Sequence, residues 1–498
     1  MLRRRRPAGS LGSLRSGAFT AASLVVVAAG SAAIGIVIAR EFGRGEDTDG
    51  LLAAYGVFIV LTIAAQSIRV AVLPQFALAR ADGRLAGEIA GAALALLVAA
   101  APVIVIAELG AGVLAELLTG ADSGLAHATA ENALRWMVPA ACAYLVAAIA
   151  ASALAALDDY GTAALGFAVG SLAGLALILL RAGEDGIEAI SWGISLNASV
   201  ALLVPVSALA VKALRERVPA RAARPTGSAL AARLGGFAVA ASLPLALQLL
   251  YVVCLPFAAR LGEGEATSFV YAYLAASALV AVTASSLGLV TSVPLARIGL
   301  DPAGVARHVV AASWLALVFV GLACAVVAVV GADLFEAVLG SVYGDEVGEE
   351  LSRLVVFLGP WMIVAVGFTV TFPLVFVAGR TSRLPWIGVA ALALQLPLAW
   401  AGAETLGLVG LALALATTTA LVLAALLAGL GALRPAARGL VVAALLVTLS
   451  TAGALGVSRI ASSTALELAL VIAVYLLALL LLCRRPLLES WTYVRALG

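Results

Sequence analysis

The sequence predicts an all-α polytopic membrane protein with about 14 transmembrane helices, arranged as two six-helix repeats that form facing bundles and two further C-terminal helices. Three observations lead to this prediction. The composition is strongly apolar, the two halves of the chain share a pattern of residues, and basic and acidic loops alternate along the sequence.

Apolar runs of spanning length recur throughout the chain. Hydrophobic residues make up 63% of the sequence, charged residues make up 12%, and the mean hydropathy is +1.13, which excludes a soluble globular protein. A helix needs about 20 apolar residues to cross a bilayer. The candidate spans are 17–40, 51–79, 86–107, 132–157, 161–181, 188–212, 236–259, 268–296, 308–331, 353–378, 384–402, 405–432, 439–458 and 463–483. The first is longer than the core of a signal peptide and leads directly into the first repeat.

An internal repeat relates the two halves of the chain, with a period of about 219 residues. Gly43 and Glu46, in the loop after the first span, match Gly262 and Glu265 in the loop after the seventh. Further matches pair Glu116, Arg135, Pro139 and Thr162 with Glu336, Arg353, Pro360 and Thr381. A duplicated membrane bundle is typical of transporters, whose substrate site lies where the repeats meet. The repeat therefore favours transport, and we expect no enzymatic activity.

Loop charges alternate in sign from one predicted loop to the next. Most of the 30 basic residues lie in loops on one side, and most of the 28 acidic residues lie in loops on the other. Basic loops stay in the cytoplasm, so we expect both termini to be cytoplasmic and the chain to lie in a bacterial inner membrane. An odd number of spans would break this alternation.

The same pattern predicts a basic cytoplasmic N-terminus, two six-helix bundles joined by a basic linker, a helix pair and a cytoplasmic tail. In that order, the segments are 1–16, 17–214, 215–233, 234–433, 434–483 and 484–498. The linker 215–233 carries five arginines. It is either a plain cytoplasmic loop or an amphipathic segment that lies on anionic headgroups.

Four stretches resemble one known transporter family. They are Ile38–Asp49, Arg135–Pro139 with the turn Ala155–Gly161, Ser268–Tyr273 with Pro294, and Leu406–Thr417. In order and spacing they resemble the lipid II flippase family (MurJ/MviN) of the multidrug/oligosaccharidyl-lipid/polysaccharide (MOP) exporter superfamily, over nearly the whole chain. The resemblance implies that a polyprenyl-linked sugar headgroup crosses from the inner to the outer leaflet by alternating access. It also implies that spans 13 and 14 add a groove for the lipid tail.

The arginines that the resemblance implies in the transport cavity are absent or displaced. In that family, arginines of spans 1, 2 and 8 line the cavity, and their paired donors suit a diphosphate. Ile34 and Ala275 occupy the matching positions of spans 1 and 8 here. Span 2 offers Gln66 and Arg69 instead, nearer the cytoplasmic end.

Arg69 is the only basic residue well inside a predicted span, where a charge costs about 2.5 to 3.5 kcal/mol. We predict that Arg69 and Gln66, which lie on the same helix face, bind the phosphate or sugar of the substrate. The alternative is a shorter span from which Arg69 reaches the cytoplasmic interface.

Polar residues inside other spans are further substrate-binding candidates. Gln248 and Gln395 each lie near a proline, which frees a backbone carbonyl, and Asn197 lies inside the sixth span. Each of the three could instead be a packing residue beside a helix kink.

Two charged pairs in the matching outer loops are candidate gating residues. Arg40 could pair with Glu46, and Arg260 with Glu265, to close the outer mouth, or the arginines could simply anchor the helix ends at the interface. The acidic loop 333–350 lacks the spacing of a calcium site. We therefore predict no metal and no cofactor.

The predicted function is translocation of peptidoglycan lipid II or another polyprenyl-linked glycan of the cell wall. Two alternatives stay open: a cation-coupled multidrug or metabolite exporter of the same superfamily, and a non-transporting scaffold of envelope synthesis. The expected partners are the lipid-linked precursor, membrane lipids and other envelope-synthesis proteins, with no nucleic acid.

Overall fold

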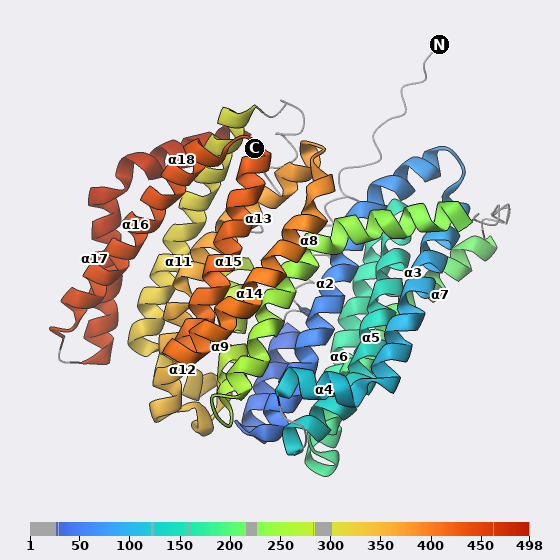
Figure 1. Ribbon diagram of the computed structural model, residues 1–498, viewed down its shortest axis with the longest axis horizontal. Coiled ribbons are helices and arrows are strands. Elements are labelled where there is room, and N and C mark those ends of the chain that lie inside the picture. Colours follow the sequence, from blue (N-terminus) through green and yellow to red (C-terminus); the bar gives the residue numbers. More distant parts are fainter. Residues whose placement is uncertain are drawn as a thin grey trace. The chain divides into compact units, whose positions relative to one another are not determined.

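The computed structural model describes residues 26–27, 29–120, 124–157, 159–215, 227–281, 283, 301–461 and 463–497. Within these ranges the chain forms helices joined by turns and contains no β-strand (Figure 1). The chain divides into two compact units, Met1–Gln248 and Leu249–Gly498. The boundary falls within α8, and each unit is described by itself below.

The first unit is built around a helix, α5, whose C-terminal part is buried on all sides. Its elements are η1 (Ile38–Phe42), α2 (Glu46–Ala81), α3 (Leu85–Leu109), α4 (Ala111–Thr119), α5 (Leu125–Ala156), α6 (Tyr160–Asp185), α7 (Glu188–Arg215) and the start of α8 (Gly227–Ala259). Every residue from Ala147 to Ala156 is buried, which is typical of a helix enclosed by others. The helices α2, α3, α4 and α7 pack against α5, and α6 packs against α7.

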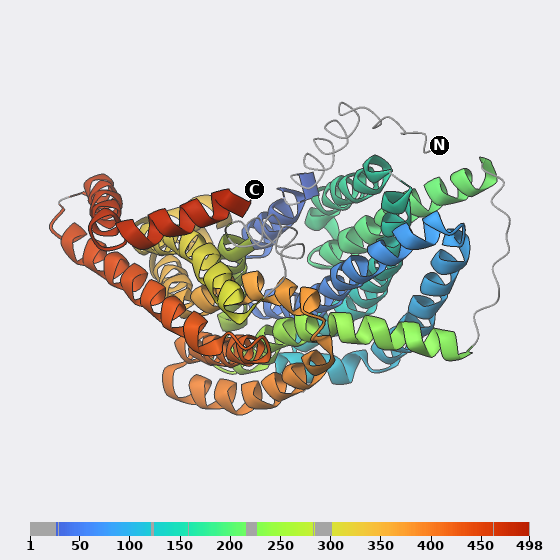
Figure 2. The ribbon, with the colours of Figure 1, turned by 90° about the horizontal axis from the view of Figure 1, so that it is seen from above.

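The second unit contains two neighbouring groups of helices. Its elements after α8 are α9 (Glu265–Val280), α11 (Pro302–Leu339), η3 (Ser341–Tyr343), α12 (Asp345–Phe357), α13 (Gly359–Val377), η4 (Thr381–Arg383), α14 (Leu384–Leu406), α15 (Leu408–Gly429), α16 (Leu433–Ser458), α17 (Thr464–Leu482) and α18 (Arg484–Leu497). The helix α11 packs against α12, α13, α16 and α17, while α15 packs against α13 and α14. Figure 2 shows α18 crosswise to α17.

The sequence repeat is reproduced by the backbone. Glu46 begins α2 and Glu265 begins α9. The amide of Asp49 donates to the carbonyl of Gly45 at 2.9 Å, and the amide of Ser268 donates to the carbonyl of Gly264 at the same distance, 219 residues later. Gly264 has a φ of 77°, a conformation that costs glycine nothing and disfavours other residues. The two helices therefore start alike, although the glycine with positive φ is Gly43 in the first loop, at 67°, and Gly264 in the second.

Eleven described helices are long and apolar enough to span a membrane, or up to 12 if one bent pair counts as a single span. The bent pair is α12 with α13, which meet at 43° where the sequence predicts one span over 353–378. Pro360 lies at the start of α13 and cannot continue the hydrogen bonding of the preceding helix. The predicted spans 17–40 and 268–296 extend beyond the described ranges, so the count of 14 stays a prediction.

Basic residues gather at one end of each unit, which we call its basic end. In the first unit, Arg233 of α8 lies 2.6 Å from Glu88 of α3, and Arg80 donates to the carbonyl of Ala156 at 2.6 Å. Residues 216–226 of the linker lie outside the described ranges. The last linker residues, 227–233, form the first turns of α8.

Candidate functional site

A cavity of about 230 Å³ lies inside the first unit, along one face of α2; we call it the α2 cavity. Its lining residues on α2 are Tyr55, Phe58, Ile59, Thr62, Ala65 and Arg69. Their spacing of three or four residues places them on one face of the helix. From Tyr55 to Arg69 this face extends about 21 Å at 1.5 Å per residue. The α2 cavity is therefore an elongated space with Arg69 at one end.

Four other segments complete the wall of the α2 cavity. They contribute Val27, Ser31 and Ile34 from the segment before η1, Tyr144 and Ala148 from α5, Phe167 from α6, and Ile194 and Asn197 from α7. The wall therefore combines several aromatic rings with few polar groups. This composition is typical of small-molecule sites, in which apolar surface binds and polar groups orient the ligand.

The aromatic residues of the wall form a continuous series. The rings of Tyr55 and Phe58 stack with centroids 5.6 Å apart, and Tyr144 meets Phe58 edge-on at 5.9 Å. Tyr144 also stacks on Phe167 at 5.9 Å, with 13° between the ring planes. These contacts hold the side chains in fixed orientations. The wall is therefore rigid where the rings line it.

Arg69 is half-buried and supplies the positive charge of the cavity. It makes no hydrogen bond or ion pair with another residue that the structure describes. No aspartate or glutamate is among the described residues that line the cavity. A charged residue inside a span is costly and normally faces a partner or an aqueous cavity. Arg69 thus presents guanidinium donors to a space with no protein anion among its described lining.

Asn197 supplies a second polar group of the α2 cavity. Its Oδ1 atom is buried and accepts no hydrogen bond within the described part of the chain. The backbone around Asn197 packs directly on α6, because a Cβ atom at Gly170 would lie 2.6 Å from the Asn197 carbonyl oxygen. Glycine at position 170 therefore allows α7 to approach closely and sets the position of Asn197.

The other predicted substrate-binding residues lie elsewhere. The side chain of Gln66 is outside the described residues. Gln248 is 9% exposed in α8. Gln395 is fully buried in α14, and its Nε2 donates to Cys254 Sγ at 3.2 Å. The structure brings together Arg69 and Asn197 at one cavity, and the binding roles of all five residues stay predictions.

The predicted gating residues lie in the matching loops of the two units. Arg40 is exposed in η1, and Glu46 is exposed at the start of α2. Within the described residues, Glu46 makes no ion pair with Arg40. In the second unit Arg260 is exposed after α8, and Glu265 begins α9. The gating role stays a prediction for all four residues.

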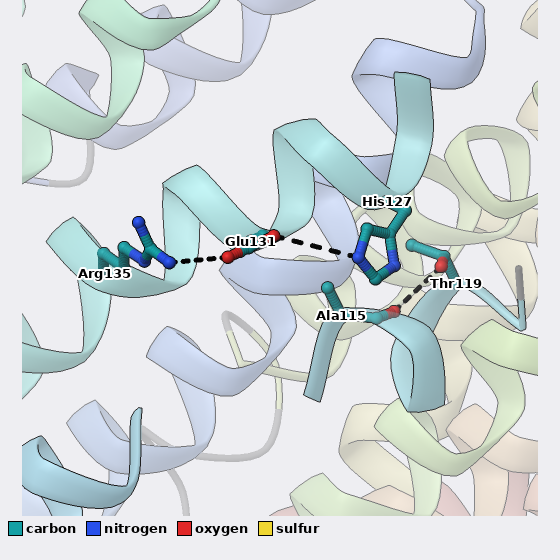
Figure 3. A network of polar contacts seen from close by, with 5 residues as sticks. All are labelled: Ala115, Thr119, His127, Glu131 and Arg135. Atoms are coloured by element: carbon teal, nitrogen blue, oxygen red, sulfur yellow. Dashed lines mark hydrogen bonds and ion pairs between the residues drawn. The ribbon is translucent and has the colours of Figure 1, made fainter. Parts of the chain in front are cut away.

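A separate polar network lies on the first turns of α5 (Figure 3). Arg135 Nη2 lies 2.6 Å from Glu131 Oε1, and His127 Nε2 lies 3.8 Å from Glu131 Oε2. None of these three residues lines the α2 cavity. No group of three or more His, Cys, Asp or Glu residues that could hold a metal ion occurs within the described ranges.

The aromatic residues of the α2 cavity are absent from the sequence-based prediction. Tyr55, Phe58 and Arg69 share a helix face, and that spacing is the available signal. Aromatic residues at helical spacing are equally typical of a packed core, however, so the pattern alone does not reveal a cavity. Tyr144 and Phe167 come from other helices, and only the tertiary fold brings them to the same wall.

No protein-family model matches the chain, and no curated protein matches it. Solved structures do. A lipid II flippase MurJ in an inward closed conformation aligns with a TM-score of 0.70 at 16% identity, over 95% of this chain and 99% of that one. An inward-facing MATE-family multidrug transporter of the MOP superfamily aligns with a TM-score of 0.63 at 14% identity, over 83% and 94%.

A third solved structure is a MOP superfamily transporter from Pyrococcus furiosus, whose binding pocket is described as having reversed polarity. It aligns with a TM-score of 0.54 at 16% identity, over 88% of this chain and 96% of that one. At these identities the likeness concerns the fold. The chain therefore has the fold of the lipid II flippase MurJ and of MATE transporters in the MOP superfamily, as the sequence resemblance predicts.

Proposed function

We propose that the protein is a flippase that moves a lipid-linked, anionic cell-envelope precursor from the inner to the outer leaflet. The observation that carries this proposal is Arg69, which has no partner among the described residues and lies at one end of the aromatic-lined α2 cavity. The fold likeness to a lipid II flippase supports the same class of substrate.

The charge of the α2 cavity favours an anion. A guanidinium offers several donors in a fixed plane and binds phosphate through paired, charge-assisted hydrogen bonds. No described lining residue carries a negative charge that would compete for Arg69. A diphosphate that links a sugar to a polyprenyl chain would therefore supply the counter-charge that Arg69 lacks.

The rest of the wall suits a sugar next to that phosphate. Flat aromatic faces such as those of Tyr55 and Tyr144 can pack against the apolar face of a sugar ring, while the Nδ2 group of Asn197, whose Oδ1 is buried, can donate to a hydroxyl. The cavity volume of about 230 Å³ lies below the range of about 300 to 1,000 Å³ for ordinary ligand pockets. It therefore accommodates part of a large headgroup, not the whole.

Transport would need no covalent step. Hydrocarbon rejects a charged headgroup, so the protein has to offer a polar path and shift between an inward-open and an outward-open state. The substrate drives that shift only through its different affinity for the two states. Arg69 is the group we expect to make this affinity depend on the headgroup phosphate.

Reconstitution tests the proposal. The full chain is placed in liposomes with a fluorescent polyprenyl-diphosphate-linked sugar, and the label that reaches the opposite leaflet is measured by its access to a membrane-impermeant quencher. We expect Arg69→Gln to lower the transport rate by about tenfold to a hundredfold, which corresponds to loss of a charge-assisted hydrogen bond. Arg459→Gln, at an exposed arginine after α16, is the matched control and should transport normally.

Three outcomes would contradict the proposal, and the last two identify the alternatives. Equal transport by Arg69→Gln and the control would mean that Arg69 does not bind the headgroup during transport. If the wild-type protein moves no lipid-linked sugar but exports a cationic dye along an ion gradient, the chain is a cation-coupled exporter. If neither moves and envelope precursors keep their distribution after depletion of the protein, the scaffold hypothesis holds.

A further inference from the structure

The basic end of the second unit contains a cavity of about 450 Å³ where α13, α14 and α15 meet; we call it the arginine corner. Its polar side chains are Arg380, Ser382 and Arg383, from the turn between α13 and α14. The remaining lining residues are Val375, Gly379, Leu384, Ile387, Ala425, Leu426, Gly429 and Leu430. Two guanidinium groups therefore border a space that is otherwise apolar.

An apolar groove of about 340 Å³ continues from the arginine corner between α14 and α15. The corner and the groove share Arg383, Ile387 and Ala425. Beyond them the groove is lined by Trp386, Ala390, Ala391, Leu394, Thr418, Leu421 and Val422. The polar corner and the apolar groove therefore adjoin along α14 and α15.

The charge of the arginine corner is not neutralised by its described surroundings. Arg380 donates through Nη1 to the carbonyl of Gly429 at the end of α15. Arg383 makes no hydrogen bond or ion pair within the described residues. No aspartate or glutamate is among the residues that line the corner or the groove. A basic pocket between transmembrane helices at this position attracts an anionic headgroup.

The corner and the groove together match one leaflet of a bilayer in length. From Leu384 to Leu394 the wall on α14 extends about 15 Å, and from Leu430 to Thr418 the wall on α15 extends about 18 Å, at 1.5 Å per residue. Half of a hydrocarbon core of about 30 Å is about 15 Å. Trp386 is 75% exposed beside the arginines, as expected for a side chain at headgroup level.

We propose that the arginine corner and its groove bind one anionic phospholipid of the adjacent leaflet. The phosphate would lie between Arg380 and Arg383, and one acyl chain would lie between α14 and α15. A polyprenyl chain is much longer than a groove of one leaflet, which is why we assign a phospholipid. This site is independent of the proposed transport, because every residue involved belongs to the second unit and none lines the α2 cavity.

Lipid titration with native mass spectrometry on the purified full chain tests the headgroup site. We expect Arg380→Gln with Arg383→Gln to weaken phosphatidylglycerol binding by about thirtyfold and to leave phosphatidylcholine binding unchanged. The matched control is Arg434→Gln with Arg438→Gln, which removes the same charge from two exposed arginines of α16. The control should stay within about threefold of the wild type, because Arg434 and Arg438 line neither the corner nor the groove.

Because Arg380 also bonds to Gly429, the double variant could lose stability. The single variant Arg383→Gln avoids this problem and should weaken phosphatidylglycerol binding by about fivefold. The groove is tested separately by Ala390→Trp, which fills it, against Ala393→Trp, on an exposed position of α14 outside the groove lining. Only Ala390→Trp should release the phospholipid, by about tenfold.

Three results would overturn the proposal. Equal losses in the arginine variants and in their α16 control would mean that the surface charge alone attracts the lipid. Binding of inorganic phosphate as tight as that of phosphatidylglycerol would mean that no chain is recognised. Preferred retention of a polyprenyl phosphate would assign the groove to a different lipid.

Discussion

The two units share a backbone pattern and differ in what fills their interiors. In the first unit the interior keeps a cavity with Arg69 at one end. In the second unit the rings of Tyr251 and Tyr273 stack with centroids 4.1 Å apart, and Tyr273 contacts Trp361 at 5.0 Å. The repeat therefore fixes helix starts, while the described aromatic side chains near the start of α9 pack on one another and those of α2 border a cavity.

The basic ends of the two units differ in the same way. In the first unit Lys212 Nζ lies 2.6 Å from Asp159 Oδ2, so the turn that starts α6 is tied to α7 by a neutral ion pair. In the second unit Arg380 reaches a backbone carbonyl at the end of α15, which leaves its charge uncompensated. The charge of Lys212 is therefore paired with a carboxylate, whereas the charge of Arg380 is available to an anion.

The largest expected effect concerns a feature that the units share. In each of the hairpins α6–α7 and α14–α15, two glycines allow the helices to come into contact. A Cβ at Gly193 would lie 2.7 Å from the Gly174 carbonyl oxygen. A Cβ at Gly402 would lie 2.5 Å from the Gly410 carbonyl oxygen. We expect Gly193→Val and Gly402→Val each to destabilise the protein by about 3 kcal/mol through overpacking. Thermal unfolding in detergent measures this, with Gly453→Val, in open space, as the control. A large effect in only one unit would mean that the two hairpins do not depend equally on their glycine contacts.

The second prediction separates the two interiors. We expect Asn197→Ala to lower the transport rate by about fivefold, which corresponds to loss of one neutral hydrogen bond. Gln395→Met keeps the side-chain volume of a fully buried residue and removes its polar groups, so a packing role predicts transport within about twofold and a binding role predicts a similar loss. The liposome assay measures both variants alongside their melting temperatures. Loss of transport in Gln395→Met, with normal melting, would place the substrate in the second unit.

The smallest expected effect concerns the loss of folding stability at acidic pH. Burial raises the pKa of Asp159, but hydrogen bonds from Lys212 and Thr162 and the Lys212 charge outweigh it and hold this pKa below its ordinary value of 3.8. A lowered pKa stabilises the fold above the ordinary value, and this contribution is lost as the pH falls through the folded value. We expect Asp159→Asn to cost about 0.5 to 1 kcal/mol at neutral pH, because the pair is partly exposed.

The corner of the second unit provides the control for that prediction. The bond from Arg380 to the Gly429 carbonyl has no titrating acid, so Arg380→Gln should lower stability equally at pH 3 and pH 7. Melting temperatures across this range compare the two variants. If Asp159→Asn also shifts stability equally at both pH values, the Lys212–Asp159 ion pair does not cause the loss of stability at acidic pH.

Much of the fold follows from local sequence. Apolar runs predict most of the described spans, and the repeated Gly-x-Gly-Glu pattern predicts the starts of both α2 and α9, because glycine and a first-turn acid act within one helical turn. The break at Leu358 between α12 and α13 is absent from the prediction, since hydropathy is averaged over a whole span. The helix α18 is also absent, because its amphipathic pattern is too polar to resemble a span.

The candidate site is only partly predictable. Arg69 is identified from sequence because an isolated charge in an apolar run is costly whatever surrounds it. The aromatic wall depends on contacts between helices distant in sequence, such as Phe58 of α2 with Tyr144 of α5. The same limit applies to the hydrogen bond from Gln395 to Cys254, which joins residues 141 positions apart.

Site-specific photo-crosslinking shows whether the lipid-linked substrate enters the α2 cavity. A photoreactive phenylalanine replaces Tyr144 in the α2 cavity or, in a second variant, Tyr273 in the second unit, and each is irradiated with a polyprenyl-diphosphate-linked sugar. We expect an adduct at position 144 that Arg69→Gln abolishes, and no adduct at position 273. An adduct at position 273, or one at position 144 that persists in Arg69→Gln, would contradict this expectation.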